Sequence, residues 1–233
     1  MRKLFLAAAL AGILAVPLPR QASAAEPAVP VLAPSVDAPL AKVPGTATAI
    51  LSGGCFWGVQ LVFQHVKGVR AAISGYTGGS AATAHYEDVS TGTTGHAESV
   101  KILFDPSVVS YGTLLRIYFS VATNPTELDF QGPDHGSQYR GELWVENPEQ
   151  RRIAEAYVHQ LTSDHTFPAP IVTLIHHAMP FYRAERYHQN FATLHPDYPY
   201  IVFNDAPKAA ALGRLFPTLY SARPVLVRVA STN

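Results

Sequence analysis

The sequence predicts one α+β domain: a mixed, mostly antiparallel sheet with helices packed on it in a ferredoxin-like two-layer core, with long loops. Segments with the two-residue alternation of strands and segments with helical spacing follow each other irregularly along the chain. Several neighbouring predicted strands lack a full crossover helix between them, which favours α+β over a parallel α/β sheet. A length of 233 residues without an internal repeat fits one domain.

The predicted elements follow from local pattern. Strand character is found in five segments: Thr46 to Ser52, Val69 to Tyr76, Ala97 to Phe104, Tyr139 to Val145 and Ile171 to Ile175. Helical spacing is found in five others: Phe56 to Val66, Tyr111 to Ala122, Pro148 to Leu161, Phe181 to Leu194 and Ala206 to Leu215. Asn147 is placed to cap the helix that begins at Pro148.

Two polar, glycine-containing stretches are predicted to be long loops, Gly75 to Gly95 and Asn124 to Gln138. Loops of this length inside a compact domain tend to be functional, so we look for chemistry there.

Composition excludes several classes of protein. Hydrophobic residues make up 48% of the chain, which excludes intrinsic disorder. A single cysteine excludes an internal disulfide framework and a cysteine-rich metal centre. The chain has 10 histidines but no metal-ligand spacing, so we expect no metal. Seventeen basic residues balance seventeen acidic ones, so nothing indicates a nucleic-acid partner.

The N-terminus has the three parts of a secretory signal peptide. A basic start, Arg2-Lys3, precedes an uncharged apolar run from Leu4 to Leu18 and an Ala-x-Ala signature at Ala22 to Ala24. The alternative is a membrane anchor, but the run is shorter than the roughly 20 residues that a spanning helix needs. We therefore expect residues 1–24 to be cleaved from an exported protein, most simply of a bacterial periplasm, with no membrane contact afterwards.

The rest of the chain divides by composition. Residues 25–44 are rich in Ala, Pro and Val and predict a flexible leader. Residues 45–222 form the predicted domain, and 223–233 a C-terminal tail. No surplus apolar segment remains unassigned, so we expect a monomer.

Cys55 is the first candidate for chemistry. A lone cysteine is most often a small buried hydrophobe. Here glycines flank it, and the pattern places it at a strand-to-helix turn. A helix N-terminus favours the thiolate and lowers the thiol pKa, which suits a nucleophile. Phe56 and Trp57 follow directly; either is core, or one of them lines a pocket.

Four further polar residues are candidates. Alternation places Glu98 on an apolar strand face, where a carboxyl holds its proton longer and can act as an acid. Tyr86 and Tyr139 lie in or beside the polar loops, where each hydroxyl either packs or donates to an oxygen. Asp134 belongs to a dense polar stretch whose roles spacing does not assign.

Two other functions stay open from these residues alone. One is a cysteine hydrolase, in which His96 or His135 would serve as the base for Cys55. The other is a non-catalytic peptide-binding module with an aromatic-lined pocket.

Five ordered motifs resemble those of the A class of peptide methionine sulfoxide reductases: Gly54 to Gly58, Gly75 to Gly79, His85 to Val89, Gly92 to Glu98 and Gly132 to Arg140. Ala184 to Gln189 resembles a later helix motif of that family, with Arg186 where an acidic residue is common. The likeness runs from about Ala49 to Tyr200.

The resemblance implies a role for each candidate. Cys55 would attack the sulfur of a methionine S-sulfoxide, free or in a protein, and become a sulfenic acid. Glu98 would protonate the sulfoxide oxygen, and the hydroxyls of Tyr86 and Tyr139 would bond to it. Asp134 would order the site. The aromatic pair that follows Cys55, Phe56 and Trp57, would bind the substrate methyl group.

The resemblance also implies how the enzyme is regenerated. Many family members carry resolving cysteines near the C-terminus, and this chain has none; its segment from Tyr200 to Tyr220 resembles cysteine-free tails. No bound cofactor is then expected. An external thiol reductant would be consumed instead: a thioredoxin-like protein, a glutaredoxin-like protein or a small thiol.

Overall fold

A computed structural model describes residues 27–228 of the chain. The predicted signal peptide, residues 1–24, lies outside the described residues. Between residues 27 and 228, no helix is long and apolar enough to cross a bilayer.

The described chain is built on a six-stranded sheet with the order β7-β6-β1-β3-β2-β8. The strands are β1 (Ala47–Gly53), β2 (Val69–Thr77), β3 (Ala97–Phe104), β6 (Gly141–Val145), β7 (Leu174–His177) and β8 (Phe181–Arg183). Only β6 and β7 pair in parallel, and the other neighbours are antiparallel. The sheet is therefore mixed and mostly antiparallel, as the sequence predicts.

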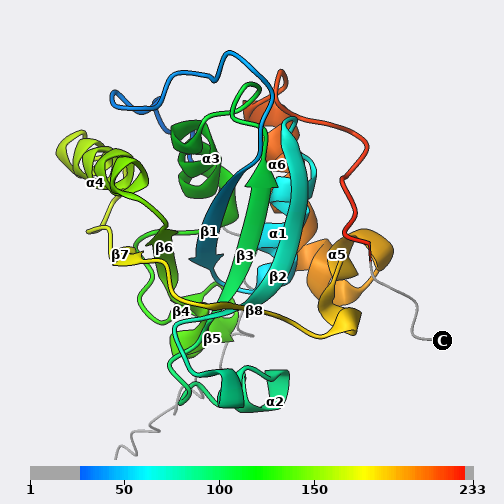
Figure 1. Ribbon diagram of the computed structural model, residues 1–233. Helices are drawn as coiled ribbons and strands as arrows, with labels where there is room; N and C mark the ends of the chain where they lie inside the picture. The colour runs from blue at the N-terminus through cyan, green and yellow to red at the C-terminus, as the bar shows by residue number, and fades with distance from the viewer. Residues whose placement is uncertain (1–26, 229–233) are drawn as a thin grey trace, which may run out of the picture.

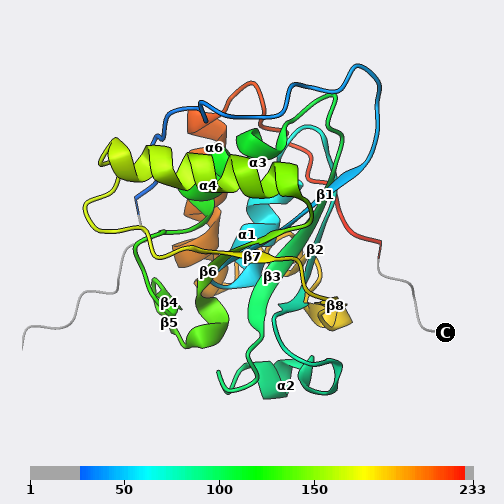
Figure 2. The same cartoon turned by 60° about the vertical axis from the view of Figure 1, so that its left-hand side comes forward.

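Helices cover one face of this sheet. They are α1 (Phe56–Gln64), α3 (Tyr111–Ile117), α4 (Pro148–Ser163) and α6 (Ala206–Leu215). Figure 1 shows α1, α3 and α6 behind the central strands, and Figure 2 shows α4 beside α3 in the same layer. In chain order, β1-α1-β2 and β3-α3-β6 form the two halves of a ferredoxin-like core, which confirms the predicted two-layer arrangement.

The core lies between this helical layer and one face of the sheet. Along β1, Ala49 and Leu51 belong to the main hydrophobic cluster, whereas Ile50 belongs to a small cluster on the opposite face. On β3 the same alternation puts Val100 and Ile102 into the main cluster. Glu98 shares their parity, so its side chain faces the helical layer at the end of the core.

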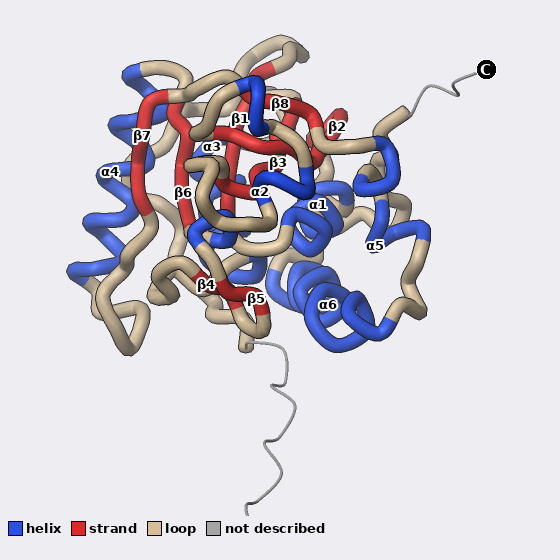
Figure 3. The backbone as a smooth tube through the Cα atoms, turned by 90° about the horizontal axis from the view of Figure 1, so that it is seen from below, coloured by secondary structure: helices blue, strands red, loops and turns tan. Residues whose placement is uncertain are grey.

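Short elements occupy the two predicted long loops. The first loop holds α2 (Tyr86–Val89) and a 3₁₀ turn, and the second holds the hairpin of β4 (Phe130–Gln131) and β5 (Asp134–His135). Figure 3 looks onto the end of the sheet where these elements lie close to the start of α1.

The predicted helix over Phe181 to Leu194 is wrong. The segment contains β8, a 3₁₀ turn at Arg186–His188 and the short α5 (Phe191–Leu194). Gln189 explains the break, because its amide bonds to the backbone N–H and carbonyl of Ser74 and to the carbonyl of Ala184. Asn190, with φ of 60°, then reverses the chain direction before α5.

Three other predicted boundaries are displaced. The last strand begins at Leu174 rather than Ile171. Tyr139 ends a 3₁₀ turn instead of starting β6, and α3 passes into a π-helical turn at Tyr118–Ala122.

The predicted leader and tail pack on the domain. The described leader, residues 27–44, forms no helix or strand, but Val31 is buried and the Tyr157 hydroxyl donates to the Leu32 carbonyl at 2.6 Å. The Asp37 carboxylate accepts from Gly112 N–H at the start of α3. In the tail, the Val227 N–H donates to the Asn190 side-chain oxygen, and the Asn190 side-chain amide donates to the Val227 carbonyl. Composition predicts a flexible leader, but these contacts hold residues 27–44 against the domain.

Candidate active site

Cys55 lies at the junction of β1 and α1, as the sequence predicts. Gly54 makes the turn with φ of 88°, and a Cβ there would lie 2.6 Å from Cβ of Gln131. Cys55 occupies the N-cap position of α1, is half-buried and is not in a disulfide.

All seven residues predicted for the site line one cavity of about 170 Å³: Cys55, Phe56, Trp57, Tyr86, Glu98, Asp134 and Tyr139. They come from α1, α2, β3, β5 and the 3₁₀ turn before β6. His188 and Tyr200 complete the lining. The structure therefore brings together residues that are up to 84 positions apart in the chain and adds two that the sequence did not predict.

Glu98 is a buried acid that holds its proton. Its side chain enters the cavity from the start of β3, and Phe56 N–H donates to its Oε2 at 2.9 Å. Burial raises the pKa of Glu98 to about 8; Phe56 N–H opposes this rise, and the charges of Asp134 and Asp205 add to it. At neutral pH the carboxyl is mostly protonated and can give a proton to a bound oxygen.

The Cys55 thiol is also held neutral. Burial raises the pKa of Cys55 well above its usual value, and the charges of Glu98, Asp205 and Asp134 raise it further. The Trp57 backbone N–H lowers it, in the direction expected of a helix N-terminus. The prediction that this helix end lowers the thiol pKa overall is therefore wrong, because burial and three carboxyl groups outweigh one amide.

Two tyrosines supply neutral hydroxyl donors. Burial raises the pKa of both Tyr86 and Tyr139, so each keeps its proton across the physiological range. Tyr86 is fixed by Glu185, whose Oε1 accepts from Tyr86 N–H at 2.9 Å. Protonated hydroxyls that line the cavity can donate to an oxygen that gains negative charge.

Asp134 lies at the side of the cavity, where the Tyr200 hydroxyl donates to its Oδ2. Burial raises the pKa of Asp134, while Tyr200 and the Lys208 charge oppose the rise. Asp134 therefore orders Tyr200, and its charge also acts on Cys55.

Aromatic rings form the apolar wall. Phe56 is buried, and Trp57 stacks on Phe191 with ring centroids 3.9 Å apart. The Trp57 indole N–H donates to Nδ1 of His188 at 3.2 Å, and the ring of His188 packs on Phe56 and Tyr86. Burial lowers the pKa of His188 to about 4, so this ring is neutral. Both Phe56 and Trp57 line the cavity, and Phe56 also belongs to the main hydrophobic cluster with Trp57 packed against it, so the two alternatives from the sequence hold together.

The candidate bases of a cysteine hydrolase lie elsewhere. His96 bonds to Gly79 N–H and to the Ser80 carbonyl, and the exposed His135 stacks on Phe130. Neither lines the cavity around Cys55. Among residues 27–228, no cluster of His, Cys, Asp and Glu could hold a metal ion.

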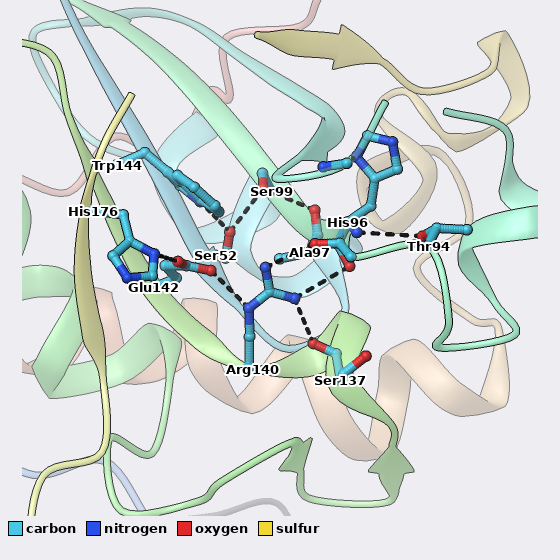
Figure 4. Close-up of polar contacts among 12 residues, drawn as sticks. Ser52, Thr94, His96, Ala97, Ser99, Ser137, Arg140, Glu142, Trp144 and His176 are labelled. Atoms are coloured by element: carbon cyan, nitrogen blue, oxygen red, sulfur yellow. Dashed lines mark hydrogen bonds and ion pairs between the residues drawn. The ribbon is translucent and has the colours of Figure 1, made fainter. Parts of the chain in front are cut away.

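A polar clamp on the outer face of the sheet supports this site (Figure 4). Arg140 pairs with buried Glu142 at 2.7 Å and donates to the carbonyls of Gly95, His96 and Ser137 at 3.0, 3.3 and 2.9 Å. The first two carbonyls precede Glu98, and the third precedes Tyr139. Arg140 thus connects the backbones that carry the acid and one hydroxyl donor.

Two site residues escaped sequence analysis. Tyr200 precedes the predicted last helix, in a segment without a chemical motif of its own. His188 lies inside the segment that was predicted as a helix, where the structure has a 3₁₀ turn instead. The signal for His188 was its membership of the Ala184 to Gln189 motif.

Fold and cavity define a single-domain α+β enzyme whose site centres on a cysteine. A family model described as peptide methionine sulfoxide reductase matches residues 47–216. The chain is 62% identical over 188 residues to peptide methionine sulfoxide reductase MsrA 2 of Mesorhizobium japonicum, covering 81% of this chain and 96% of that protein. It is 42% identical to the MsrA protein of Thermus thermophilus, covering 73% and 96%.

Solved structures give the same result. Methionine sulfoxide reductase A of Corynebacterium diphtheriae matches with a TM-score of 0.55 and 29% identity, covering 75% of this chain and 87% of that one. Reduced Mxr1 from Saccharomyces cerevisiae matches with a TM-score of 0.58 and 25% identity, covering 67% and 92%. The chain belongs to the peptide methionine sulfoxide reductase family, in its A class. It is an oxidoreductase, a peptide-methionine (S)-S-oxide reductase that depends on a thiol.

Proposed function

We propose that Cys55 carries the reduction and that Glu98 is its acid partner. The observation that carries this proposal is the Phe56 N–H to Glu98 bond, which holds a protonated carboxyl at the helix end that bears Cys55. Sulfoxide oxygen is a poor leaving group until it is protonated, so an acid beside the nucleophile meets the main demand of the reaction.

The proposed reaction balances in two stages. Cys55 sulfur attacks the sulfoxide sulfur while Glu98 protonates the oxygen and Tyr86 and Tyr139 donate hydrogen bonds to it. The proton that the Cys55 thiol loses replaces the one that Glu98 gives, so the carboxyl ends the step protonated. The oxygen is transferred to Cys55 as a hydroxyl, the thioether leaves, and Cys55 becomes a sulfenic acid. A thiol then attacks the Cys55 sulfur and water leaves; a second thiol releases the mixed disulfide and restores the Cys55 thiol.

The reductant of the second stage is proposed to come from outside the chain. The sequence has one cysteine, so the sulfenic acid has no internal thiol partner. A thioredoxin-like protein, a glutaredoxin-like protein or a small thiol meets this need. The signal-like N-terminus supports a role in the periplasm, in repair of oxidised exported proteins or reduction of free methionine sulfoxide. A monomer is proposed because no surplus apolar segment remains unassigned.

The test uses mature protein, a racemic methionine sulfoxide blocked at both ends, and excess dithiothreitol. We expect chromatography to show thioether formation that stops when about half of the racemate is consumed, because one sulfur epimer is used. Cys55→Ser should form none. Thioether formation by Cys55→Ser at the wild-type rate would overturn the proposal.

Export is tested separately. The full chain is expressed in a Gram-negative host, and the periplasmic fraction is analysed by intact-mass spectrometry. We expect a product that begins at Ala25. A full-length product in the cytoplasmic fraction would contradict the periplasmic assignment.

A further inference from the structure

Asp205 is a buried carboxyl with no hydrogen-bond partner among the described residues. It ends the π-helical turn at Ile201–Asp205, directly before α6, and its side chain is inaccessible to solvent. Neither Oδ1 nor Oδ2 has a donor within hydrogen-bond distance. An isolated buried carboxylate is costly, so a purely structural position would be occupied more stably by an apolar residue.

The position of Asp205 relative to α1 connects it to the site. A Cβ built on Gly58 would lie 2.2 Å from Asp205 Oδ1, so the carboxyl occupies space that a side chain at this position would fill. Gly58 belongs to the first turn of α1, three residues after Cys55. The carboxyl of Asp205 therefore lies at the helix end whose first amides serve Glu98 and Cys55.

Several charged or titratable groups face Asp205. The charges of Asp134 from β5 and Lys208 from α6 shift the pKa of Asp205. The charge of Asp205 in turn raises the pKa of Cys55, Glu98 and Tyr200. Burial raises the pKa of Asp205 to about 7; Lys208 opposes this rise and Asp134 adds to it. The carboxyl thus changes charge close to neutral pH, beside a thiol that must lose its proton to react.

We propose that Asp205 is a positioning residue of the active site that acts on Cys55 through its charge. The protonated carboxyl permits thiolate formation, and the ionised carboxyl opposes it. Asp205 belongs to the Tyr200 to Tyr220 segment, which holds no cysteine in this chain. This segment would thus govern the reactivity of the single thiol without supplying a second one. The inference rests on the proposed function only in taking Cys55 as the nucleophile.

The test measures the thiol itself, without a sulfoxide. Because Cys55 is the single thiol, the rate of its alkylation by iodoacetamide against pH reports its ionisation alone. In Asp205→Asn, which keeps the shape of the side chain, we expect the midpoint to move down by about one pH unit, the size of effect that a nearby charge produces. Asp205→Ala should move it in the same direction, because both variants remove the charge.

Asp197→Asn is the matched control, because Asp197 is exposed and the substitution is chemically the same. Its midpoint should equal that of the wild type. A lower melting temperature with an unchanged midpoint in both Asp205 variants would make Asp205 merely structural and overturn the inference. Absence of sulfoxide reduction by the wild type would instead contradict the proposed function. The alkylation midpoints could still be measured in that case, because they do not depend on a sulfoxide.

Discussion

Phe56 N–H donates a hydrogen bond of 2.9 Å to Glu98 Oε2, and this bond joins the first turn of α1 to the start of β3. The two residues are 42 positions apart in the chain. The bond uses one of the N–H groups that every helix leaves unpaired at its start. It therefore orients the carboxyl without consuming a donor that the helix needs, and it keeps that carboxyl beside Cys55.

The first prediction concerns pH. The raised pKa of Glu98, about 8, means that its proton is present below that value and lost above it. Reduction under saturating reductant should therefore fall as pH rises through about 8. Glu98→Gln keeps an acceptor for Phe56 N–H but has no proton to give, so its rate should drop by about 10²- to 10⁴-fold. A stopped assay of thioether formation against pH checks both. A variant as fast as wild type at pH 7 would exclude Glu98 as the acid.

The same pKa makes a prediction about stability. The folded protein binds the Glu98 proton more tightly than the unfolded chain does, so this contribution to the free energy of unfolding is complete below about pH 4.5 and is lost as pH rises through about 8. Relative to wild type, Glu98→Gln should gain stability across that window. Urea unfolding at pH 5 and at pH 8.5 measures it; an equal difference at both values would contradict the assigned shift.

The tyrosine hydroxyls should act on rate rather than on folding. Removing one hydrogen-bond donor to a developing oxyanion costs about 10²- to 10³-fold in rate. We expect losses of this order in Tyr139→Phe and Tyr86→Phe, with little change in melting temperature. Tyr157→Phe is the matched control, because its hydroxyl bonds to the Leu32 carbonyl away from the cavity. It should lose stability but retain its kcat.

The outer clamp should affect kcat more than KM. Arg140→Lys keeps the charge but loses the planar set of donors that holds three carbonyls and Glu142. Small displacements of Glu98 and Tyr139 then lower the rate by about 10-fold or more. Steady-state kinetics with blocked methionine sulfoxide separate the two constants. A rise in KM alone would show that Arg140 affects substrate binding and not the position of the acid.

The turn before Cys55 should tolerate no side chain. Gly54→Ala combines a positive φ with a contact of 2.6 Å to Gln131, and both are unfavourable. Gly132→Ala is the control, since it has a positive φ but nothing within 4 Å. We expect Gly54→Ala to be less stable than Gly132→Ala by about 1 kcal/mol or more. Equal unfolding midpoints would mean that Gln131 moves aside freely.

Local signals predicted much of this fold. Asn147 was predicted as an N-cap, and its side chain accepts from Gln150 N–H at 2.9 Å. The glycine-flanked Cys55 was expected at a strand-to-helix turn, where it lies. These features depend on a few neighbouring residues, so the local sequence is enough to predict them.

Features set by distant contacts were not predictable. Gln189 bonds to Ser74, 115 positions away, and this contact overrides the helical spacing of the segment around it. Burial raises the Cys55 pKa first, and the charges of Glu98, Asp205 and Asp134 add to the rise; no local pattern predicts either the burial or the placing of these carboxyls. Tyr200 was missed for the same reason, since its place in the cavity and its bond to Asp134 both depend on residues far from it in the chain.

The small size of the cavity at Cys55 has a consequence for the order of events in the proposed reaction. A space of about 170 Å³ around one half-buried sulfur has room for one small group at a time. In the proposed reaction, the sulfoxide and the reducing thiol both have to reach that sulfur. In the proposed reaction the thioether therefore leaves before a reducing thiol enters. The proposed turnover is then a double displacement, and we expect double-reciprocal plots at several reductant concentrations to form parallel lines.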